Sequence, residues 1–193
     1  MKTDGLYITS DPHFGERVHI GGFSSAEERD EHIIKRWNET VEPGARVLVL
    51  GDVGSGQANI KQLGRLHGQK WLMLGNHDTS HVAFYQKFFV KILPCWIRLD
   101  QDFLCTHVPM HPNELEYRSP FNVHGHTHRI ENAPGMEDKR YKCVCIEQTG
   151  YAPVLWDEVA AEVRFVNGWH CEPEMDVIVS TPDPARAVYE EHG

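Results

Sequence analysis

The sequence lacks any long apolar segment. None of its 193 residues belongs to an apolar run near the roughly 18 residues that a membrane-spanning helix needs. Its opening, MKTDGLYITSDPHF, also lacks the apolar core and the small-residue cleavage site of a secretory signal peptide. We therefore expect a soluble, cytoplasmic protein that does not bind a membrane.

Cysteine is scarce and its spacing is irregular. The five cysteines stand at positions 95, 105, 143, 145 and 171, an odd number with no CxxC pair. This pattern argues against a disulfide framework and against a zinc site built from four thiolates. We expect reduced, buried cysteines, of which Cys143 and Cys145 would share one face of a strand.

Basic residues are outnumbered by acidic ones. Lys and Arg total 19 against 28 for Asp and Glu, which gives a formal net charge of −9. A protein that binds long nucleic acid without sequence preference needs many cations on phosphates, so this class is disfavoured. The charge does not exclude a phosphate substrate, because bound metal ions can reverse the local sign.

The alternation of apolar runs and helical patterns predicts an α/β fold. Apolar runs at 6–9, 47–50 and 71–74 indicate buried strands, each followed by polar residues. A capping box at Ser25 begins one helix, and a shorter helix is predicted at 60–66. Such alternation is typical of parallel sheets, which bind ligands at the carboxyl ends of their strands.

The second half of the chain has a different pattern. Short runs that we interpret as strands cover 88–93, 96–99, 103–106, 121–124 and 141–146. The spacing of the valines in 156–166 predicts a helix. We assign one domain to residues 1–167 and a surface-wrapping or interaction tail to residues 168–193, which contain three prolines.

The unusual feature is histidine, with 13 in the chain. Five polar fragments stand at predicted strand ends: Asp11-Pro12-His13, Gly51-Asp52, Gly75-Asn76-His77-Asp78, Thr106-His107 and Gly125-His126-Thr127-His128. Each fragment alone is typical of a turn or a packed histidine. Together they supply oxygen and nitrogen ligands that suit Mn²⁺, Fe, Zn²⁺ or Ni²⁺. We expect both histidines of the last fragment to point to one side of an extended segment.

The order and identity of these fragments resemble the calcineurin-like metallophosphoesterases, especially the compact single-domain bacterial and phage members. The segment 10–15 (SDPHFG), Glu147 and the segment 151–154 resemble the same group. The resemblance covers roughly Leu6 to Trp156. It implies a four-layer α/β/β/α sandwich of two mixed sheets flanked by helices.

The resemblance also implies a role for each matching residue. Seven residues would bind two divalent metal ions, with manganese favoured: Asp11, His13 and His128 at the first ion, Asn76, His107 and His126 at the second, and Asp52 between them. A hydroxide that bridges the two ions would attack phosphorus. His77 would protonate the leaving group, and Asp78 would orient or polarise His77.

Substrate contacts are expected at the rim of this site. Close relatives often carry a histidine where this chain has Glu16, so Arg17 and His19 are candidates to contact the substrate, as is Arg118. His124 is expected to be a packed histidine. A site without a large cap domain favours small or nucleotide phosphodiesters as substrates.

Other interpretations of the same residues stay open. The site could instead cleave phosphomonoesters or nucleic acid, although long nucleic acid fits the acidic charge poorly. The fold could be a non-catalytic metal-binding scaffold for a protein partner, although His77 and all seven ligand positions are present. In the plainest interpretation, the histidines only stabilise an α/β protein. The sequence leaves the oligomeric state open.

Overall fold

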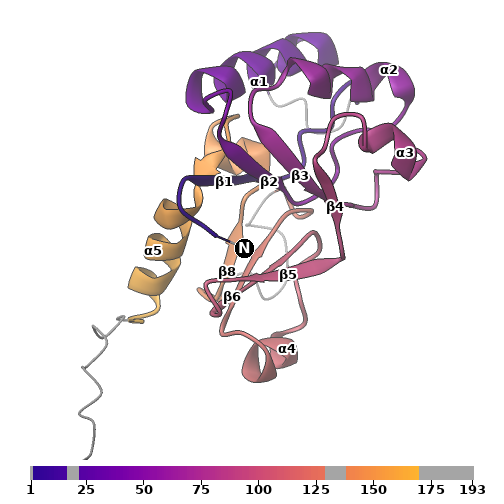
Figure 1. The fold of residues 1–193 in the computed structure, drawn as a ribbon. Helices are drawn as coiled ribbons and strands as arrows, with labels where there is room; N and C mark the ends of the chain where they lie inside the picture. The colour runs from indigo at the N-terminus through magenta and orange to yellow at the C-terminus, as the bar shows by residue number, and fades with distance from the viewer. Residues whose placement is uncertain (1, 17–21, 129–137, 170–193) are drawn as a thin grey trace, which may run out of the picture.

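The computed structural model describes residues 2–16, 22–128 and 138–169 as two mixed β-sheets with helices around them (Figure 1). The first sheet has the strand order β4-β3-β2-β1-β9. Its strands are β1 (Leu6–Thr9), β2 (Arg46–Val49), β3 (Gln69–Met73), β4 (Lys91–Leu93) and β9 (Val154–Leu155). Neighbouring strands run parallel, except that β9 is antiparallel to β1. The parallel pairing predicted for the first half of the chain is therefore confirmed.

The second sheet has the strand order β5-β6-β7-β8. Its strands are β5 (Trp96–Leu99), β6 (Phe103–Thr106), β7 (Phe121–His124) and β8 (Tyr141–Cys143). β5 is antiparallel to β6, whereas β6, β7 and β8 run parallel. A parallel bridge between Ser10 and Cys145 joins the chain just after β1 to the chain just after β8. The carboxyl ends of strands from both sheets therefore meet.

The helices are short apart from two. They are α1 (Ala26–Thr40), α2 (Gln57–Ile60), α3 (Val82–Tyr85), α4 (Pro112–Tyr117) and α5 (Trp156–Val166), with 3₁₀ turns at Lys61–Arg65 and Ile146–Thr149. The Ser25 hydroxyl accepts from the Glu28 amide, as the predicted capping box requires. The Glu28 carboxylate accepts from the Ser24 amide instead of closing the box on Ser25. Within the described residues, no helix is long and apolar enough to cross a membrane.

Apolar side chains form two cores, one on each face of the first sheet. Ile8 and Leu48 of this sheet pack with Phe103 and Val123 of the second sheet and with Trp156 of α5. The other core contains apolar residues of α1, β2, β3 and α3. Figure 1 shows α1, α2 and α3 together on the side of the first sheet away from the second. The first core therefore packs the two sheets against each other.

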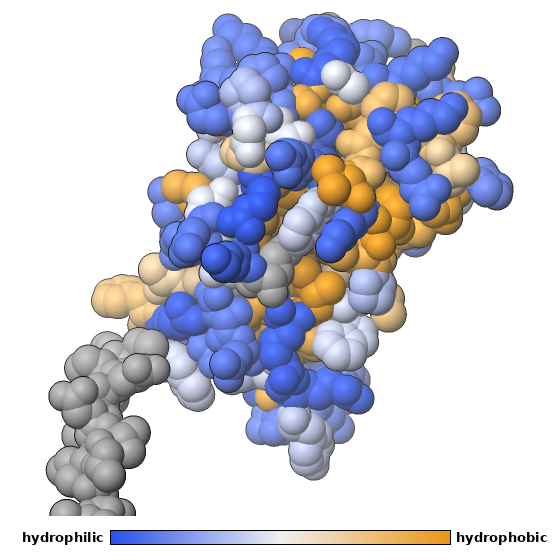
Figure 2. Space-filling model, viewed as in Figure 1, coloured by the Kyte–Doolittle hydropathy of each residue, from blue (hydrophilic) through white to orange (hydrophobic). Residues whose placement is uncertain are grey.

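Hydrophilic side chains dominate the face of the molecule shown in Figure 2. Hydrophobic side chains gather on the side where β4 and β5 form the edges of the two sheets. Exposed residues next to these edges include Val90 and Trp96.

Two predicted strands are shorter than expected. Of residues 88–93 only β4 is a strand, because the Phe89 amide bonds to the Tyr85 carbonyl and continues the turn after α3. Residues 141–146 contain β8, after which a 3₁₀ turn begins. The helix predicted at 60–66 is divided between α2 and the 3₁₀ turn that follows it. The sequence pattern does not predict α3, α4 or β9. Each of these elements is too short to show a helical or strand period of apolar residues.

Candidate metal centre

The loops that follow β1 and β2 are joined through their backbones. The Asp11 amide donates to the Gly51 carbonyl and the His13 amide to the Asp52 carbonyl, each at 3.0 Å. The backbone after β3 lies equally close, since a Cβ atom at Gly75 would stand 2.2 Å from Asp52 Oδ1. Only glycine allows this approach, so the polar fragments after β1, β2 and β3 lie in one place.

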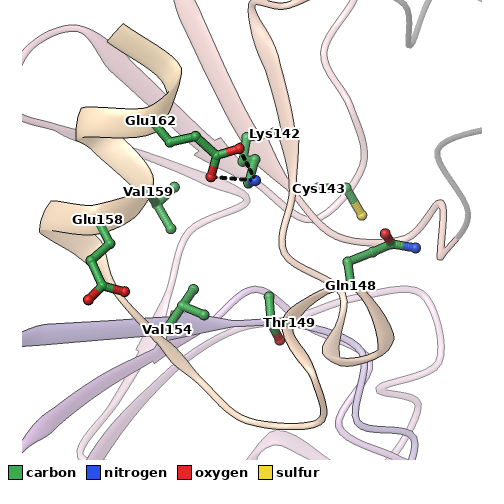
Figure 3. A pocket seen from close by; sticks show the side chains of 8 residues that line it. All are labelled: Lys142, Cys143, Gln148, Thr149, Val154, Glu158, Val159 and Glu162. Atoms are coloured by element: carbon green, nitrogen blue, oxygen red, sulfur yellow. Dashed lines mark hydrogen bonds and ion pairs between the residues drawn. The ribbon is translucent and has the colours of Figure 1, made fainter. Parts of the chain in front are cut away.

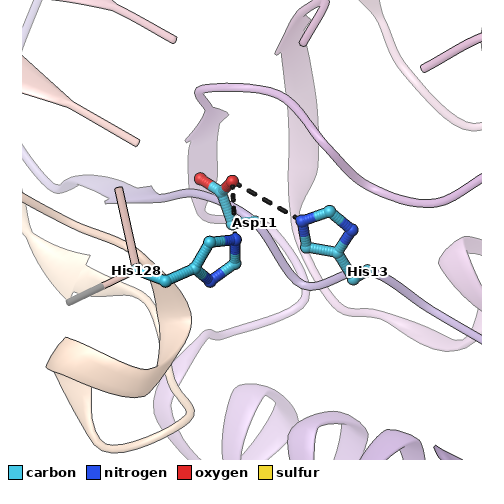
Figure 4. A group of neighbouring side chains, drawn as sticks. All are labelled: Asp11, His13 and His128. Carbon is cyan, nitrogen blue, oxygen red and sulfur yellow. Dashed lines mark ion pairs between the residues drawn. The ribbon is translucent and has the colours of Figure 1, made fainter. Parts of the chain in front are cut away.

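One group of potential ligands consists of three buried residues, Asp11, His13 and His128 (Figure 4). Asp11 Oδ1 lies 3.6 Å from His13 Nε2 and 3.4 Å from His128 Nε2. One potential ligand atom from each residue lies within 4.8 Å of the others. These are the three residues predicted to hold the first ion, and the fold brings them together.

A second group consists of Asp52, His107 and His126, whose ligand atoms also lie within 4.8 Å of one another. Asn76 belongs to it, because its Oδ1 lies 2.9 Å from His107 Nε2. Asp52 Oδ2 lies 3.4 Å from His107 Nε2 and 3.6 Å from His13 Nε2. The Asp52 carboxylate therefore stands between the two groups, where the predicted bridging ligand belongs.

The histidines are oriented by oxygen atoms behind them. Three rings direct Nδ1 to such an oxygen: His13 to Glu16 at 2.9 Å, His107 to the Leu50 carbonyl at 2.7 Å and His128 to Glu147 at 3.2 Å. Because these oxygens only accept, each Nδ1 carries a hydrogen, and Nε2 is the nitrogen that faces the Asp11 or Asp52 carboxylate. Imidazoles that bind metals are held in this way. The donor set therefore fits divalent cations.

Asp11 remains ionised despite its burial. Burial opposes the charge, but the neighbouring His13 ring, the charge of His107, the Ser10 side chain and the hydrogen bond from the His126 amide outweigh it and hold the Asp11 pKa at about 2. Its Oδ1 has no hydrogen-bond partner among the residues that the structure describes. A buried carboxylate oxygen that lies 3.4–3.6 Å from two imidazole nitrogens is suited to share a cation with them.

Backbone strain is concentrated at the same place. Five of the non-glycine residues with positive φ belong to the centre: Asp11 (59°), His13 (44°), Asp52 (52°), His126 (66°) and His128 (49°). Such conformations cost about 1–3 kcal/mol each and are typical of functional sites. The prediction that His126 and His128 point to one side of an extended segment is wrong, because both are left-handed. They turn to different groups instead.

The structure gives His77 a different partner from the one predicted. The Asp78 carboxylate accepts from the backbone amides of Asp52, Val53 and Gly75 at 2.8–2.9 Å, so it fastens loops together. Burial raises the Asp78 pKa to about 6. The His77 ring lies against Glu16 instead, with Nδ1 3.3 Å from Glu16 Oε2. The prediction that Asp78 orients His77 is therefore corrected.

Sequence reasoning missed a buried arginine that supports the centre. Arg29 of α1 is fully buried, and its Nη1 donates to the His13 carbonyl at 3.3 Å. Its Nη2 lies 3.7 Å from Glu147 Oε1, while the other Glu147 oxygen faces His128. The only signal in the sequence was a charged residue on the apolar face of a predicted helix.

Of the three predicted substrate contacts, the structure describes only Arg118, and it does not bring Arg118 to the centre. Arg118 follows α4 near the amino end of β7, the end opposite His126, and its guanidinium pairs with Glu114. Arg17 and His19 lie outside the described residues. His124 is fully buried, as expected for a packed histidine, and burial lowers its pKa to about 4.

A separate cavity of about 220 Å³ lies between α5, β8 and the second 3₁₀ turn (Figure 3). Residues that line it include Cys143, Gln148 and the ion pair of Lys142 with Glu162. Gln148 Nε2 also donates to the His128 carbonyl at 2.6 Å. One lining residue therefore contacts the backbone of a predicted ligand, but none of the predicted ligands lines the cavity.

No family model matches the chain. The chain is 36% identical to the Gene 66 protein of Mycobacterium phage L5 over 158 residues, covering 63% of this chain and 76% of that protein. It is 29% identical to an uncharacterized protein of Methanocaldococcus jannaschii over 168 residues, covering 81% of this chain and 90% of that protein.

Among solved structures, a protein of unknown function from Aquifex aeolicus has the same fold. It matches with a TM-score of 0.61 and 21% identity, covering 81% of this chain and 97% of that chain. An archaeal phosphodiesterase (22% identity, 64% of this chain and 73% of that chain) and Pseudomonas putida nuclease MPE (17%, 64% and 61%) match with TM-scores of 0.41 and 0.45. These two likenesses are too low to support an inference about function.

Proposed function

The chain belongs to the same family as the Gene 66 protein of Mycobacterium phage L5, and we propose that it is a metal-dependent phosphoester hydrolase of the calcineurin-like type. The observation that carries this proposal is the position of the Asp52 carboxylate. Its Oδ2 lies 3.4 Å from His107 Nε2 and 3.6 Å from His13 Nε2, and these two histidines belong to different ligand groups. A shared carboxylate between two such groups is the arrangement that a dinuclear centre needs. The four-layer sandwich is part of the same proposal.

Seven side chains would hold two divalent ions, with Mn²⁺ favoured because the set mixes carboxylate, amide and imidazole. The first ion would lie among Asp11, His13 and His128, the second among Asn76, His107 and His126, and Asp52 would contact both. When bound, the two ions would polarise phosphoryl oxygens and lower the pKa of a water molecule. Their charge would also attract a phosphate anion to an acidic protein.

His77 is suited to protonate the leaving group. Its amide donates to Asp52 Oδ1 at 2.7 Å, which ties its backbone to the bridging residue. Its side chain is 44% exposed, so the ring can reach a bound ester. General acid catalysis by a positioned histidine typically contributes about 10²–10⁴-fold.

We favour phosphodiesters because one half of the centre is open. Asn76 and His126 are exposed, whereas Asp11, His13 and His128 are buried. An open side leaves room for substituents on both oxygens of a diester. Phosphomonoesters, nucleic acid and a non-catalytic scaffold role are the alternatives that an assay separates.

The test is to remove all metal from the protein, add back Mn²⁺, and measure hydrolysis of a diester, bis(4-nitrophenyl) phosphate, and of a monoester, 4-nitrophenyl phosphate. We expect faster diester cleavage, no cleavage after chelation, and a loss of at least about 100-fold in Asp52→Asn. The exposed His81 provides a matched control, since His81→Ala should keep the rate. Mn²⁺ binding without turnover of any ester would indicate a scaffold, and a preference for the monoester would overturn the diester assignment.

A further inference from the structure

The Glu16 carboxylate lies between two imidazole rings at the edge of the metal centre. Its Oε2 accepts a hydrogen bond from His13 Nδ1 at 2.9 Å and lies 3.3 Å from His77 Nδ1. Its Oε1 accepts from the Ser55 amide at 2.9 Å, which fixes the carboxylate in place. The side chain is only 13% exposed, so water competes little for these contacts. Glu16 therefore contacts both a predicted ligand and the predicted acid.

The His77 ring depends on this contact for its orientation. The His77 backbone is fastened to Asp52, but the ring itself is half-exposed. The ring meets His13 edge to face, with centroids 4.9 Å apart and planes at 82°, and such a contact does not select one ring nitrogen. Asp78 directs both oxygens to backbone amides. Glu16 is thus the described group that distinguishes Nδ1 from Nε2.

We propose that Glu16 is the positioning residue for His77, an inference that rests on the proposed function. A carboxylate only accepts, so it keeps a hydrogen on His77 Nδ1 and turns Nε2 toward the substrate side. As the bond between phosphorus and the leaving oxygen breaks, the Nε2 hydrogen of the imidazolium transfers to that oxygen. The ring is left neutral, with its remaining hydrogen on Nδ1 facing Glu16.

The kinetic test uses Glu16→Gln with two diesters that differ in their leaving group. The glutamine carbonyl can still accept from the Ser55 amide, while its NH₂ group points donors at the two rings. Loss of the oriented acid should matter only where the leaving oxygen needs a proton. We expect kcat to fall about 10–100-fold for an alkyl ester and less than about 3-fold for a 4-nitrophenyl ester, at equal metal content.

Two further variants separate positioning from support of the metal. In a His77→Ala background, Glu16→Gln should no longer change the ratio of the two rates, because the residue through which it acts is gone. Glu147 provides the matched control, since it orients a predicted ligand, His128, and does not face His77. Glu147→Gln should weaken metal binding and lower both rates by a similar factor.

The readout that does not depend on turnover is the ¹⁵N NMR spectrum of the imidazoles in the metal-free protein. His77 should be protonated at Nδ1 in the wild type, and Glu16→Gln should shift the ring toward protonation at Nε2. An unchanged His77 tautomer, or equal losses on both esters, would overturn this inference. Wild-type protein that cleaves no ester would overturn the proposed function, while the tautomer would still report on Glu16.

Discussion

Gly125→Ala tests how closely the two sheets approach at the metal centre. A Cβ atom at position 125 would stand 2.1 Å from Ser10 Oγ and 2.2 Å from Asp11 Oδ2. Neither side chain is free to retreat, because both are buried and anchored. The Ser10 hydroxyl donates to the Leu50 carbonyl, and Asp11 Oδ2 accepts from the His126 amide, each at 2.9 Å.

The expected cost follows from the bonds that must break. Displacing Ser10 loses a neutral hydrogen bond worth about 1 kcal/mol, and displacing Asp11 loses a charge-assisted bond worth about 1.5–3 kcal/mol. We therefore expect the free energy of unfolding of the metal-free protein to fall by about 2.5–4 kcal/mol. The same displacement moves a predicted ligand, so Mn²⁺ affinity should fall as well.

Urea unfolding and calorimetric Mn²⁺ titration measure these two effects. Gly44→Ala is the matched control, because a Cβ atom there meets nothing within 4 Å. That control should change stability by no more than about 1 kcal/mol and leave Mn²⁺ binding intact. If Gly125→Ala unfolds and binds Mn²⁺ like the control, the close approach described here is incorrect.

Three other predictions concern metal and pH. Removing the metal with EDTA should lower the melting temperature of Mn²⁺-loaded protein, because ions at 100 times their Kd stabilise the folded state by about 2.7 kcal/mol per site. An unchanged melting curve would argue against bound ions. Glu147→Gln should weaken Mn²⁺ binding about 10–100-fold by releasing His128, as calorimetry would report; unchanged affinity would contradict the role assigned to Glu147. Burial raises the Asp30 pKa from 3.8 to about 6, so ionising this residue costs stability as pH rises between those values. Wild-type protein should therefore lose about 2–3 kcal/mol relative to Asp30→Asn between about pH 4 and pH 7, and parallel urea midpoints across that range would refute the shift.

The positions of the predicted metal ligands could be anticipated from sequence because each follows a short buried strand. Apolar runs before Asp11, Asp52 and Asn76 predict parallel strands whose carboxyl ends meet. The residue types then limit the site to metals that accept oxygen and nitrogen ligands. The sequence pattern therefore predicts where along the chain the potential ligands lie and which ligand types they are.

The division of the histidines between the two groups was implied by the family resemblance, but the strand pattern alone could not predict it. It depends on left-handed backbone at His126 and His128, and strand parity predicts the opposite. The supporting residues come from distant segments, namely the loop of Glu16, helix α1 with Arg29 and the turn at Glu147. No local period links such residues, because their proximity arises only when the two sheets pack.

The partner of His77 shows the same limit. Asp78 is adjacent in sequence, yet its carboxylate is needed by three backbone amides of neighbouring loops. Buried backbone amides without a hydrogen-bond acceptor cost free energy. Asp78 therefore accepts from these amides, and the prediction that it orients the adjacent His77 fails.

The central claim is that Asp52 joins two cation sites, and a crystal structure of the Mn²⁺-loaded protein with anomalous scattering tests it directly. We predict two anomalous peaks, one beside Asp11, His13 and His128 and one beside Asn76, His107 and His126, with the Asp52 carboxylate in contact with both. A single peak, or two peaks of which only one touches Asp52, would contradict the account.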